Sequence, residues 1–228
     1  PQLKEKPGLS SFESKPGAAG ASLGPLVKFA EKHIPENLWT STDLLLGATA
    51  GLRMIPEAAA NGILKSCRDF LQANSKFKLA EGYPRVLTGS HEGALGWLAV
   101  NFLSKRLGSE STLGVLELGG ASTQVTVKLD GTEDSDVPRF PLEVGRQMYQ
   151  LYTHSYLGFG QDAARSSYNK MLDVKKDKKV PDVCMQPDFV RNKDSAPTPY
   201  SGPKGAELDG LGQYDQCRST VVKLFDKE

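Results

Sequence analysis

The sequence predicts an α/β protein in which short apolar strands lead into loops and then into helices. Three loops of small residues each follow an apolar run, at 49–53, 89–93 and 117–124. Each loop carries one or two polar side chains among its small residues. Because strand ends and hairpin turns expose backbone N–H groups, three such loops could converge on one phosphate chain.

The N-terminal half is expected to contain little regular structure at first and then two helices. Residues 1–25 are rich in Gly, Pro, Ser and Ala and are expected to be extended or loosely ordered. A short helix is expected at 26–33, a buried strand at 43–48 and a strand-to-loop element at 49–53. A further helix is expected to open at Pro56-Glu57. The last helix is expected to bury a stripe of Ile63, Cys67, Phe70 and Leu71.

The C-terminal half is predicted to alternate between helices and one clear hairpin. A strand at 85–88 precedes a helix that is expected to pack Trp97 and a face of Leu95, Leu98, Phe102 and Leu103 into the core. A hairpin is predicted at 113–129, a helix capped by Gly158 at 144–157 and a second helix at 161–173. A long surface excursion is expected at 174–214 and a final ordered element at 220–225.

The hairpin carries the most informative residues of the chain. Apolar residues alternate on both sides of the pair Gly119-Gly120, which is expected to make a tight turn because glycine tolerates positive φ. Glu117 precedes the turn, and Ser122 and Gln124 follow it. A phosphate could approach the backbone N–H groups of this turn, although an ordinary hairpin is the alternative interpretation.

Composition limits the classes of partner. A hydrophobic content of 39%, a charged content of 24% and a net charge of +1 are typical of a globular protein and argue against nucleic acid as a partner. No apolar run approaches the roughly 20 residues that span a bilayer. Of the three cysteines, Cys184 and Cys217 are expected to form a disulfide in a region rich in Pro, Gly and Asp, and Cys67 to be free and buried.

Together, these loops resemble the signature regions of the apyrase family, the nucleoside triphosphate diphosphohydrolases. Residues 48–53, 89–101 and 117–124 are similar to the second, third and fourth signature regions, in order and at suitable spacings. The flanking stretches 6–11 and 152–155 also fit, so the resemblance covers nearly the whole chain.

The resemblance implies an actin-like (ribonuclease H-like) two-lobed fold of the ATPase superfamily. Residues 1–110 are expected to be the remainder of the first lobe, and residues 111–228 the start of the second. The first and fifth signature regions have no counterpart in this sequence, so the chain is expected to be a middle segment with an incomplete fold and to be inactive by itself.

The resemblance also implies a role for each matching residue. Glu92 would be the general base that deprotonates the attacking water, and Ser122 and Gln124 would position that water. The phosphate would be bound by backbone and side-chain groups of the hairpin and of the 49–53 loop, at Thr49, Ala50, Gly119, Gly120, Ala121 and Ser122. Arg53 would either touch phosphate or pair with an acid.

The implied cofactor is Ca²⁺ or Mg²⁺. Glu117 would hold this metal through water, at a position where the family normally has Asp, so the extra methylene puts the metal geometry in question. The implied activity is hydrolysis of nucleoside tri- and diphosphates in the secretory-pathway lumen, at the cell surface or outside the cell; membrane anchoring would require segments outside residues 1–228.

Two other functions are compatible with parts of the pattern. One is another actin-like ATPase, such as an exopolyphosphatase or a sugar kinase, although the run from Glu92 to Trp97 argues against a kinase. The other is a non-catalytic nucleotide-binding or interaction module, in which Glu117 would be a sign of lost activity.

Overall fold

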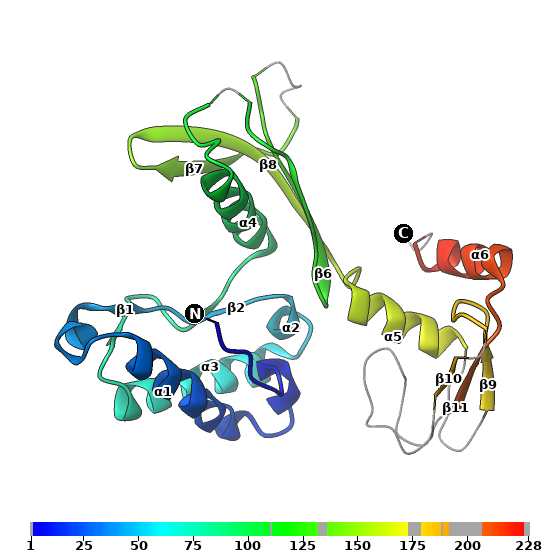
Figure 1. The fold of residues 1–228 in the computed structure, drawn as a ribbon, viewed down its shortest axis with the longest axis horizontal. Coiled ribbons are helices and arrows are strands. Elements are labelled where there is room, and N and C mark those ends of the chain that lie inside the picture. The colour runs from blue at the N-terminus through cyan, green and yellow to red at the C-terminus, as the bar shows by residue number, and fades with distance from the viewer. Residues whose placement is uncertain are drawn as a thin grey trace. The chain divides into compact units, whose positions relative to one another are not determined.

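The computed structural model describes residues 2–109, 111–131, 136–172, 179–187, 189–191 and 207–225. The chain divides into two compact units (Figure 1). The first unit contains residues 1–117 and 124–157, and the second contains residues 118–123 and 158–228. The described residues combine α-helices with short β-sheets, as the sequence predicts for an α/β protein. Among these residues, no helix has the length and apolar character needed to cross a membrane.

The N-terminal part of the first unit is built around one long helix. Its three α-helices are α1 Gly24–His33, α2 Ala50–Arg53 and α3 Glu57–Asn74. Its four 3-10 helices are η1 Leu9–Phe12, η2 Pro16–Ala18, η3 Gly20–Leu23 and η4 Glu36–Ser41. Two pairs of parallel two-residue strands are also present, β1 Asp43–Leu44 with β3 Lys78–Leu79 and β2 Gly47–Ala48 with β4 Arg85–Val86. The predicted stripe of α3 is buried at Ile63, Cys67 and Leu71, and Phe70 packs against it partly buried.

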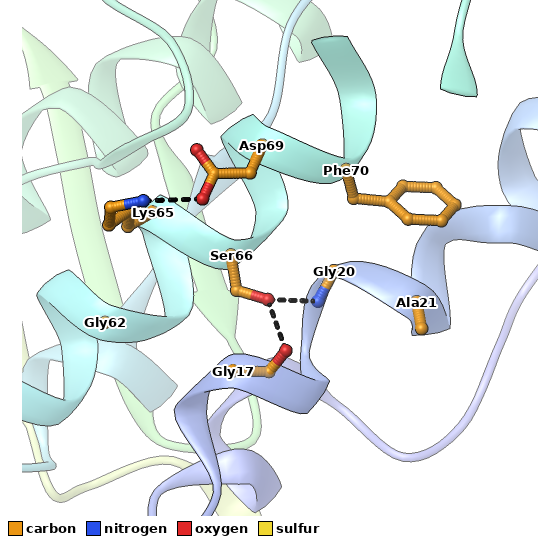
Figure 2. A pocket seen from close by; sticks show the side chains of 8 residues that line it. All are labelled: Gly17, Gly20, Ala21, Gly62, Lys65, Ser66, Asp69 and Phe70. Atoms are coloured by element: carbon orange, nitrogen blue, oxygen red, sulfur yellow. Dashed lines mark hydrogen bonds and ion pairs between the residues drawn. The ribbon is translucent and has the colours of Figure 1, made fainter. Parts of the chain in front are cut away.

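Residues 1–25 are more ordered than the composition predicts, so that expectation is wrong. They form three consecutive 3-10 helices that pack on α3. The backbone N–H of Gly20 donates to Ser66 Oγ over 2.9 Å, and Ser66 Oγ donates to the carbonyl of Gly17 over 2.9 Å (Figure 2). A Cβ at Gly20 would lie 2.3 Å from the Ser66 carbonyl oxygen. The small residues therefore permit close packing and do not indicate disorder.

Two predictions for residues 43–53 need correction. The expected strand at 43–48 is divided into β1 and β2, and only Ala48 within it is fully buried. The expected strand-to-loop element at 49–53 is instead the short helix α2. Its small residues fit a helix that lies close to its neighbours, since a Cβ on Gly51 would be 3.1 Å from Ser10 Oγ.

A four-stranded sheet and helix α4 (Gly89–Leu103) complete the first unit. The strands are β5 Val115–Leu118, β6 Ser122–Lys128, β7 Phe140–Val144 and β8 Gln147–Leu157, in the order β5-β6-β8-β7. The hairpin at 113–129 is confirmed, but the predicted helix at 144–157 is wrong. Burial in β8 alternates with period two, at Tyr149, Leu151 and Thr153, and its first residue pairs with Val144 across a turn at Gly145.

Helix α4 presents a different face to the core from the predicted one. Ala94 and Trp97 are buried together with Tyr149 and Leu151 of β8. Leu95 is exposed, and Phe102 and Leu103 are 69% and 79% exposed, so the expected core face of Leu95, Phe102 and Leu103 is wrong. The expectation for Trp97 is confirmed, and Leu98 packs partly buried against this cluster.

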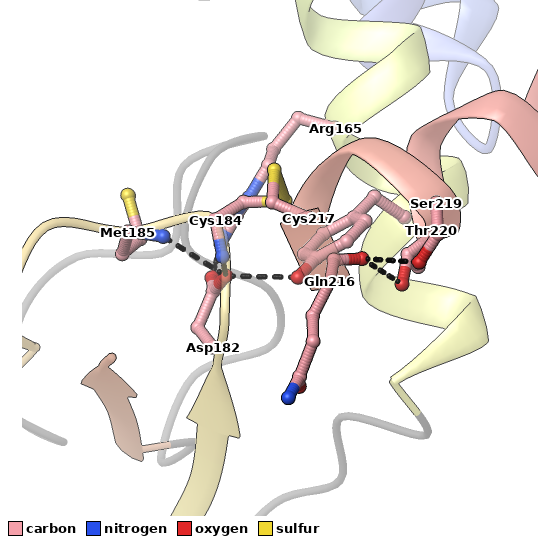
Figure 3. Close-up of a disulfide and its surroundings, with 9 residues drawn as sticks. Arg165, Asp182, Cys184, Met185, Gln216, Cys217, Ser219 and Thr220 are labelled. Carbon is pink, nitrogen blue, oxygen red and sulfur yellow. Dashed lines mark hydrogen bonds and ion pairs between the residues drawn. A yellow bond between two sulfur atoms is a disulfide. The ribbon is translucent and has the colours of Figure 1, made fainter. Parts of the chain in front are cut away.

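The second unit contains α5 Gln161–Met171, α6 Tyr214–Phe225 and a small sheet of β9 Lys179–Asp182, β10 Val190–Arg191 and β11 Glu207–Gly210, in the order β10-β11-β9. The expectation of a surface excursion at 174–214 is therefore wrong for its described residues. The predicted disulfide joins Cys184 to Cys217 (Figure 3), and Cys67 is free and buried.

Asp182, at the end of β9, is fully buried and connects this sheet to α5. It accepts hydrogen bonds from the backbone N–H groups of Cys184 and Met185 over 3.0 and 3.2 Å (Figure 3), and from the Tyr168 hydroxyl over 3.0 Å. Arg165 forms an ion pair with the same carboxylate. A buried carboxylate needs such partners, so this network accounts for the burial of Asp182 beside the disulfide.

Candidate active site

Glu92 lies in the first turn of α4, and local sequence accounts for its position. Thr88 is the N-cap residue, and its Oγ1 accepts a hydrogen bond from the His91 N–H over 3.1 Å. A side-chain cap of this kind satisfies one of the free N–H groups at a helix start. An acid in the first turn also interacts favourably with the helix dipole. The carboxylate of Glu92 is thus attached to a well-defined helix end.

Two donors from distant parts of the sequence bind the same oxygen of Glu92. Arg53 Nη2 lies 2.7 Å from Glu92 Oε2, and Gln124 Nε2 donates to that oxygen over 3.2 Å. Arg53 Nη1 also donates to the carbonyl of Leu87 over 2.9 Å. The side chains of Arg53 and Glu92 are each 15% exposed. Of the two alternatives for Arg53, the structure shows pairing with an acid.

Glycine residues on α4 allow this helix to lie directly on the sheet. A Cβ at Gly93 would be 2.3 Å from Thr153 Oγ1 and 2.6 Å from Thr126 Oγ1, and a Cβ at Gly89 would be 2.2 Å from Ser155 Cβ. Contacts this short exclude any side chain larger than hydrogen without rearrangement. The close approach brings Glu92 to Gln124, which also donates to Ser155 Oγ over 2.9 Å.

Glu117 on β5 adds a second carboxylate beside α4. Its Oε2 is 3.3 Å from the position of a Cβ at Gly96, one turn beyond Glu92. Burial, and secondarily the negative charge of Glu92, raise the pKa of Glu117. A divalent cation beside Glu117 would offset this effect, because a nearby positive charge favours the ionised form of a carboxyl group.

Glu92 and Glu117 are the acidic side chains beside α4 that could contribute oxygen ligands to a metal ion. Among them, no group of three or more His, Cys, Asp or Glu side chains lies close enough to hold a metal directly. Ca²⁺ and Mg²⁺ take oxygen ligands and Mg²⁺ usually keeps several waters, so a metal held by these two carboxylates would be held partly through water.

Thr49 and Ala50 lie at the start of α2, the same short helix that carries Arg53. Thr49 lines a hollow of about 280 Å³ whose other walls come from residues 8–10, 47–48 and 51–52. Ala50 is buried. The 49–53 and 89–93 segments therefore meet through Arg53 and Glu92, as expected for two loops of one site.

The loop Gly119–Ala121 belongs to the second unit, where it is bound by the start of α5. The carbonyl of Gly119 accepts from Gln161 N over 2.9 Å, and that of Gly120 from Asp162 N over 2.8 Å and Ala163 N over 3.0 Å. In a planar trans peptide the next N–H points away from the carbonyl. The N–H groups of Gly120 and Ala121 therefore point away from these α5 donors.

The glycines of this loop are required by close contact and not by positive φ, which corrects the expectation from the sequence. Neither Gly119 nor Gly120 is among the residues with positive φ. A Cβ on Gly120 would instead lie 2.8 Å from Asp162 Oδ2. Ser122 begins β6 and is buried, as is Gln124.

The structure brings together Glu92, Gln124 and Glu117 in the first unit, and the Gly119–Ala121 loop with Ser122 in the second. Sequence reasoning missed the contact of Ser155 with Gln124 and that of Asp162 with Gly120. A period-two pattern across 147–157 would have placed Ser155 on a strand, but no sequence signal pairs Asp162 with Gly120.

Short strands that alternate with helices, and an acid at a helix start held by Arg53 and Gln124, define an α/β protein with a candidate catalytic carboxylate. The chain belongs to the GDA1/CD39 (nucleoside phosphatase) family, whose model matches residues 2–228. This membership confirms the resemblance to apyrases.

Several curated relatives have named activities. The chain is 39% identical to ectonucleoside triphosphate diphosphohydrolase 5 of Mus musculus, over 75% of this chain and 41% of the relative. It is 34% identical to probable apyrase 4 of Arabidopsis thaliana, over 99% of this chain and 47% of the relative. It is 36% identical to a guanosine-diphosphatase of Schizosaccharomyces pombe, over 75% of this chain and 34% of the relative. The chain thus spans less than half the length of these three relatives.

The fold is also found in a solved structure. The crystal structure of nucleoside triphosphate hydrolases from Neospora caninum superimposes with a TM-score of 0.64, covering 92% of this chain and 52% of that chain. The two sequences are 17% identical, so this similarity shows a shared fold.

Proposed function

We propose that this protein is an enzyme that hydrolyses nucleoside triphosphates, nucleoside diphosphates or both, and releases phosphate. The observation that carries the proposal is the carboxylate of Glu92, which is held by Arg53 and Gln124 at the start of α4. Phosphoryl transfer depends mainly on positioning and on charge stabilisation. A positioned carboxylate is a suitable acceptor for the proton of an attacking water.

Each remaining site residue has a defined role in in-line attack on the terminal phosphate. Glu92 takes a proton from the water, and Gln124 and Ser122 orient that water. The outward N–H groups of Gly120 and Ala121 bind the phosphate, and Gly119 closes the loop by donating to the carbonyl of Ser122 over 3.0 Å. Thr49 and Ala50 contribute further phosphate contacts.

A divalent cation, Ca²⁺ or Mg²⁺, completes this proposal. When bound, it neutralises phosphate charge. Glu117 would hold it through water, supported by the proximity of Glu117 to Glu92. The presence of Glu at this position, in place of the Asp that is usual in apyrases, leads us to expect an altered preference between metals.

The wider architecture and location follow from family membership. We infer an actin-like arrangement in which residues 1–110 belong to a first lobe and residues 111–228 to a second. The disulfide Cys184–Cys217 supports an oxidising compartment, either the secretory-pathway lumen or the cell exterior. Two relatives whose names contain "ecto" support the same location.

The test is an assay of phosphate release by the protein in its natural full length, with ATP, ADP, GDP and UDP and with Ca²⁺ or Mg²⁺. Glu92→Gln should lower kcat by at least about two orders of magnitude, because it removes the base. Glu81→Gln is the matched control, since Glu81 is exposed and outside the site. Nucleotide binding without turnover in the wild type would favour the non-catalytic module instead.

A further inference from the structure

Arg53 forms an ion pair with Glu92, and the proposed hydrolysis does not by itself assign it a role. Its guanidinium bridges two points of the protein: the backbone carbonyl of Leu87 and the Oε2 atom of Glu92. Leu87 immediately precedes Thr88, the N-cap residue of α4. Arg53 therefore binds both the segment that leads into this helix and the acid in its first turn.

The two oxygens of Glu92 have different surroundings. Oε2 receives both Arg53 Nη2 and Gln124 Nε2. Among the described residues, no hydrogen bond reaches Oε1. Oε1 is nevertheless not a buried atom without a partner, so it is exposed to solvent. Water can therefore reach Oε1, while Oε2 is occupied. A carboxylate accepts through both oxygens, so occupation of one leaves the other free for a proton.

We propose that Arg53 is a positioning residue that holds Glu92 by Oε2 and thereby makes Oε1 the atom that accepts the proton of the attacking water. This inference rests on the proposed hydrolytic function and adds the atom that acts and the side chain that selects it. The proton passes from water to Glu92 Oε1, and the resulting hydroxide oxygen forms the new bond to phosphorus while the bond to the leaving phosphate oxygen breaks.

The chemistry of arginine fits this role. Its guanidinium is planar and always charged, and its donors have a rigid geometry that can engage a carbonyl and a carboxylate together. Because both Arg53 and Glu92 side chains are only 15% exposed, solvent screens this ion pair less than it would screen a surface pair. Lysine keeps the charge but cannot make both contacts with fixed geometry, so Arg53→Lys should restore only part of the function.

The closing experiment compares Arg53→Met with Arg53→Lys in the protein in its natural full length, with nucleotide hydrolysis as the readout. Loss of the positioning contact should lower kcat about 10- to 100-fold and leave KM for the nucleotide within about threefold, since misplacing a reactive group by about 1 Å has this order of effect. Arg53→Lys should lie between Arg53→Met and the wild type. Arg68→Met is the matched control, because Arg68 also donates to a backbone carbonyl, that of Pro84, but forms no ion pair with an acid in the described part of the chain.

A double-variant cycle tests whether Arg53 acts through Glu92. In the Glu92→Gln background, Arg53→Met should cause no further loss of kcat, because residues that act as one unit are not additive. Melting temperatures of all variants report folding, and guanidinium ion at a non-denaturing concentration should restore part of the kcat of Arg53→Met. A variant that does not fold is replaced in the cycle by Arg53→Lys, which keeps the charge.

The outcomes separate this inference from the proposed function. A rise in KM with unchanged kcat would show that Arg53 contacts substrate. Additive losses in the cycle would show that Arg53 acts independently of Glu92. Either result would overturn the inference alone. Full activity of Arg53→Met beside an inactive Glu92→Gln would do the same. Full activity of Glu92→Gln, or a wild-type protein without turnover, would overturn the proposed function and this inference with it.

Discussion

Asp162 lies against Gly120 so closely that a Cβ on residue 120 would be 2.8 Å from the carboxylate oxygen Oδ2. The backbone of Asp162 also donates to the carbonyl of Gly120 over 2.8 Å. The backbone of Asp162 therefore binds the proposed phosphate loop, and its side chain leaves no room for a Cβ at residue 120. Glycine at position 120 is a consequence of this contact.

Gly120→Ala should lower the free energy of unfolding by about 1–3 kcal/mol, because the added methyl overlaps Asp162. Asp162→Ala in the same chain should recover most of that loss by removing the overlapping atom. Urea unfolding of the two single variants and the double variant measures the coupling. If Gly120→Ala lowers the free energy of unfolding equally in chains with and without the Asp162 carboxylate, the contact is contradicted.

Gly93→Ala should be more damaging, because its methyl would meet Thr153 Oγ1 at 2.3 Å and Thr126 Oγ1 at 2.6 Å, two side chains that are hydrogen-bonded to each other. We expect a lower melting temperature and weaker hydrolysis, since α4 must move and carries Glu92 with it. Gly17→Ala is the control, because nothing lies within 4 Å of its Cβ position, and it should change stability by less than about 0.5 kcal/mol. A Gly93→Ala chain as stable and active as this control would refute the close approach of α4.

Glu117 should make stability depend on pH. Its pKa in the folded chain is raised above the ordinary value of 4.5, first by burial and then by Glu92. The folded chain holds this proton more tightly than the unfolded chain, so the contribution is present at low pH and is lost as pH rises through the folded pKa. Glu117→Gln should therefore be more stable than the wild type at about pH 7, with the difference shrinking in acid.

Urea unfolding across this pH range measures the effect. The exposed acid Glu81 provides the control variant Glu81→Gln, which should not reproduce the pH-dependent gain. A Glu117→Gln chain that is less stable than the wild type near neutral pH would reverse the expected sign.

A divalent cation should reduce the loss of stability that Glu117 causes near neutral pH. Adding Ca²⁺ or Mg²⁺ near neutral pH should raise the melting temperature of the wild type, because a ligand that binds only the folded state stabilises it. The increase should be smaller for Glu117→Gln, and Glu117→Asp should change which metal supports hydrolysis best. Calorimetric scans with each ion measure the first effect, and phosphate release measures the second. An identical increase for wild type and Glu117→Gln would exclude Glu117 from the metal site.

Local sequence was sufficient for several elements. The start of α3 at Pro56-Glu57, the hairpin around Gly119-Gly120 and the helix that begins at Gln161 depend on capping, alternation and helix propensity, which neighbouring residues decide. The motif residues Glu92 and Gln124 could also be selected, because their residue types suit base catalysis and water positioning.

Other features depend on contacts between distant residues. Residues 147–157 contain apolar and aromatic side chains that suit either a helix or a strand, and pairing with β7 and with β6 selects the strand. The apolar residues Phe102 and Leu103 were expected in the core, but the glycine-containing face of α4 lies on the sheet and leaves them exposed.

The sequence by itself determined the family, the α/β class and the identity of the candidate base, because these depend on residue types at short spacings. Only the tertiary structure decided that Arg53 binds Glu92 Oε2, that Glu117 lies beside the same helix, and that Gly120 accommodates Asp162. These relationships join residues separated by between 21 and 42 positions. Packing of α4 and α5 against their neighbours, which no local pattern encodes, brings them together.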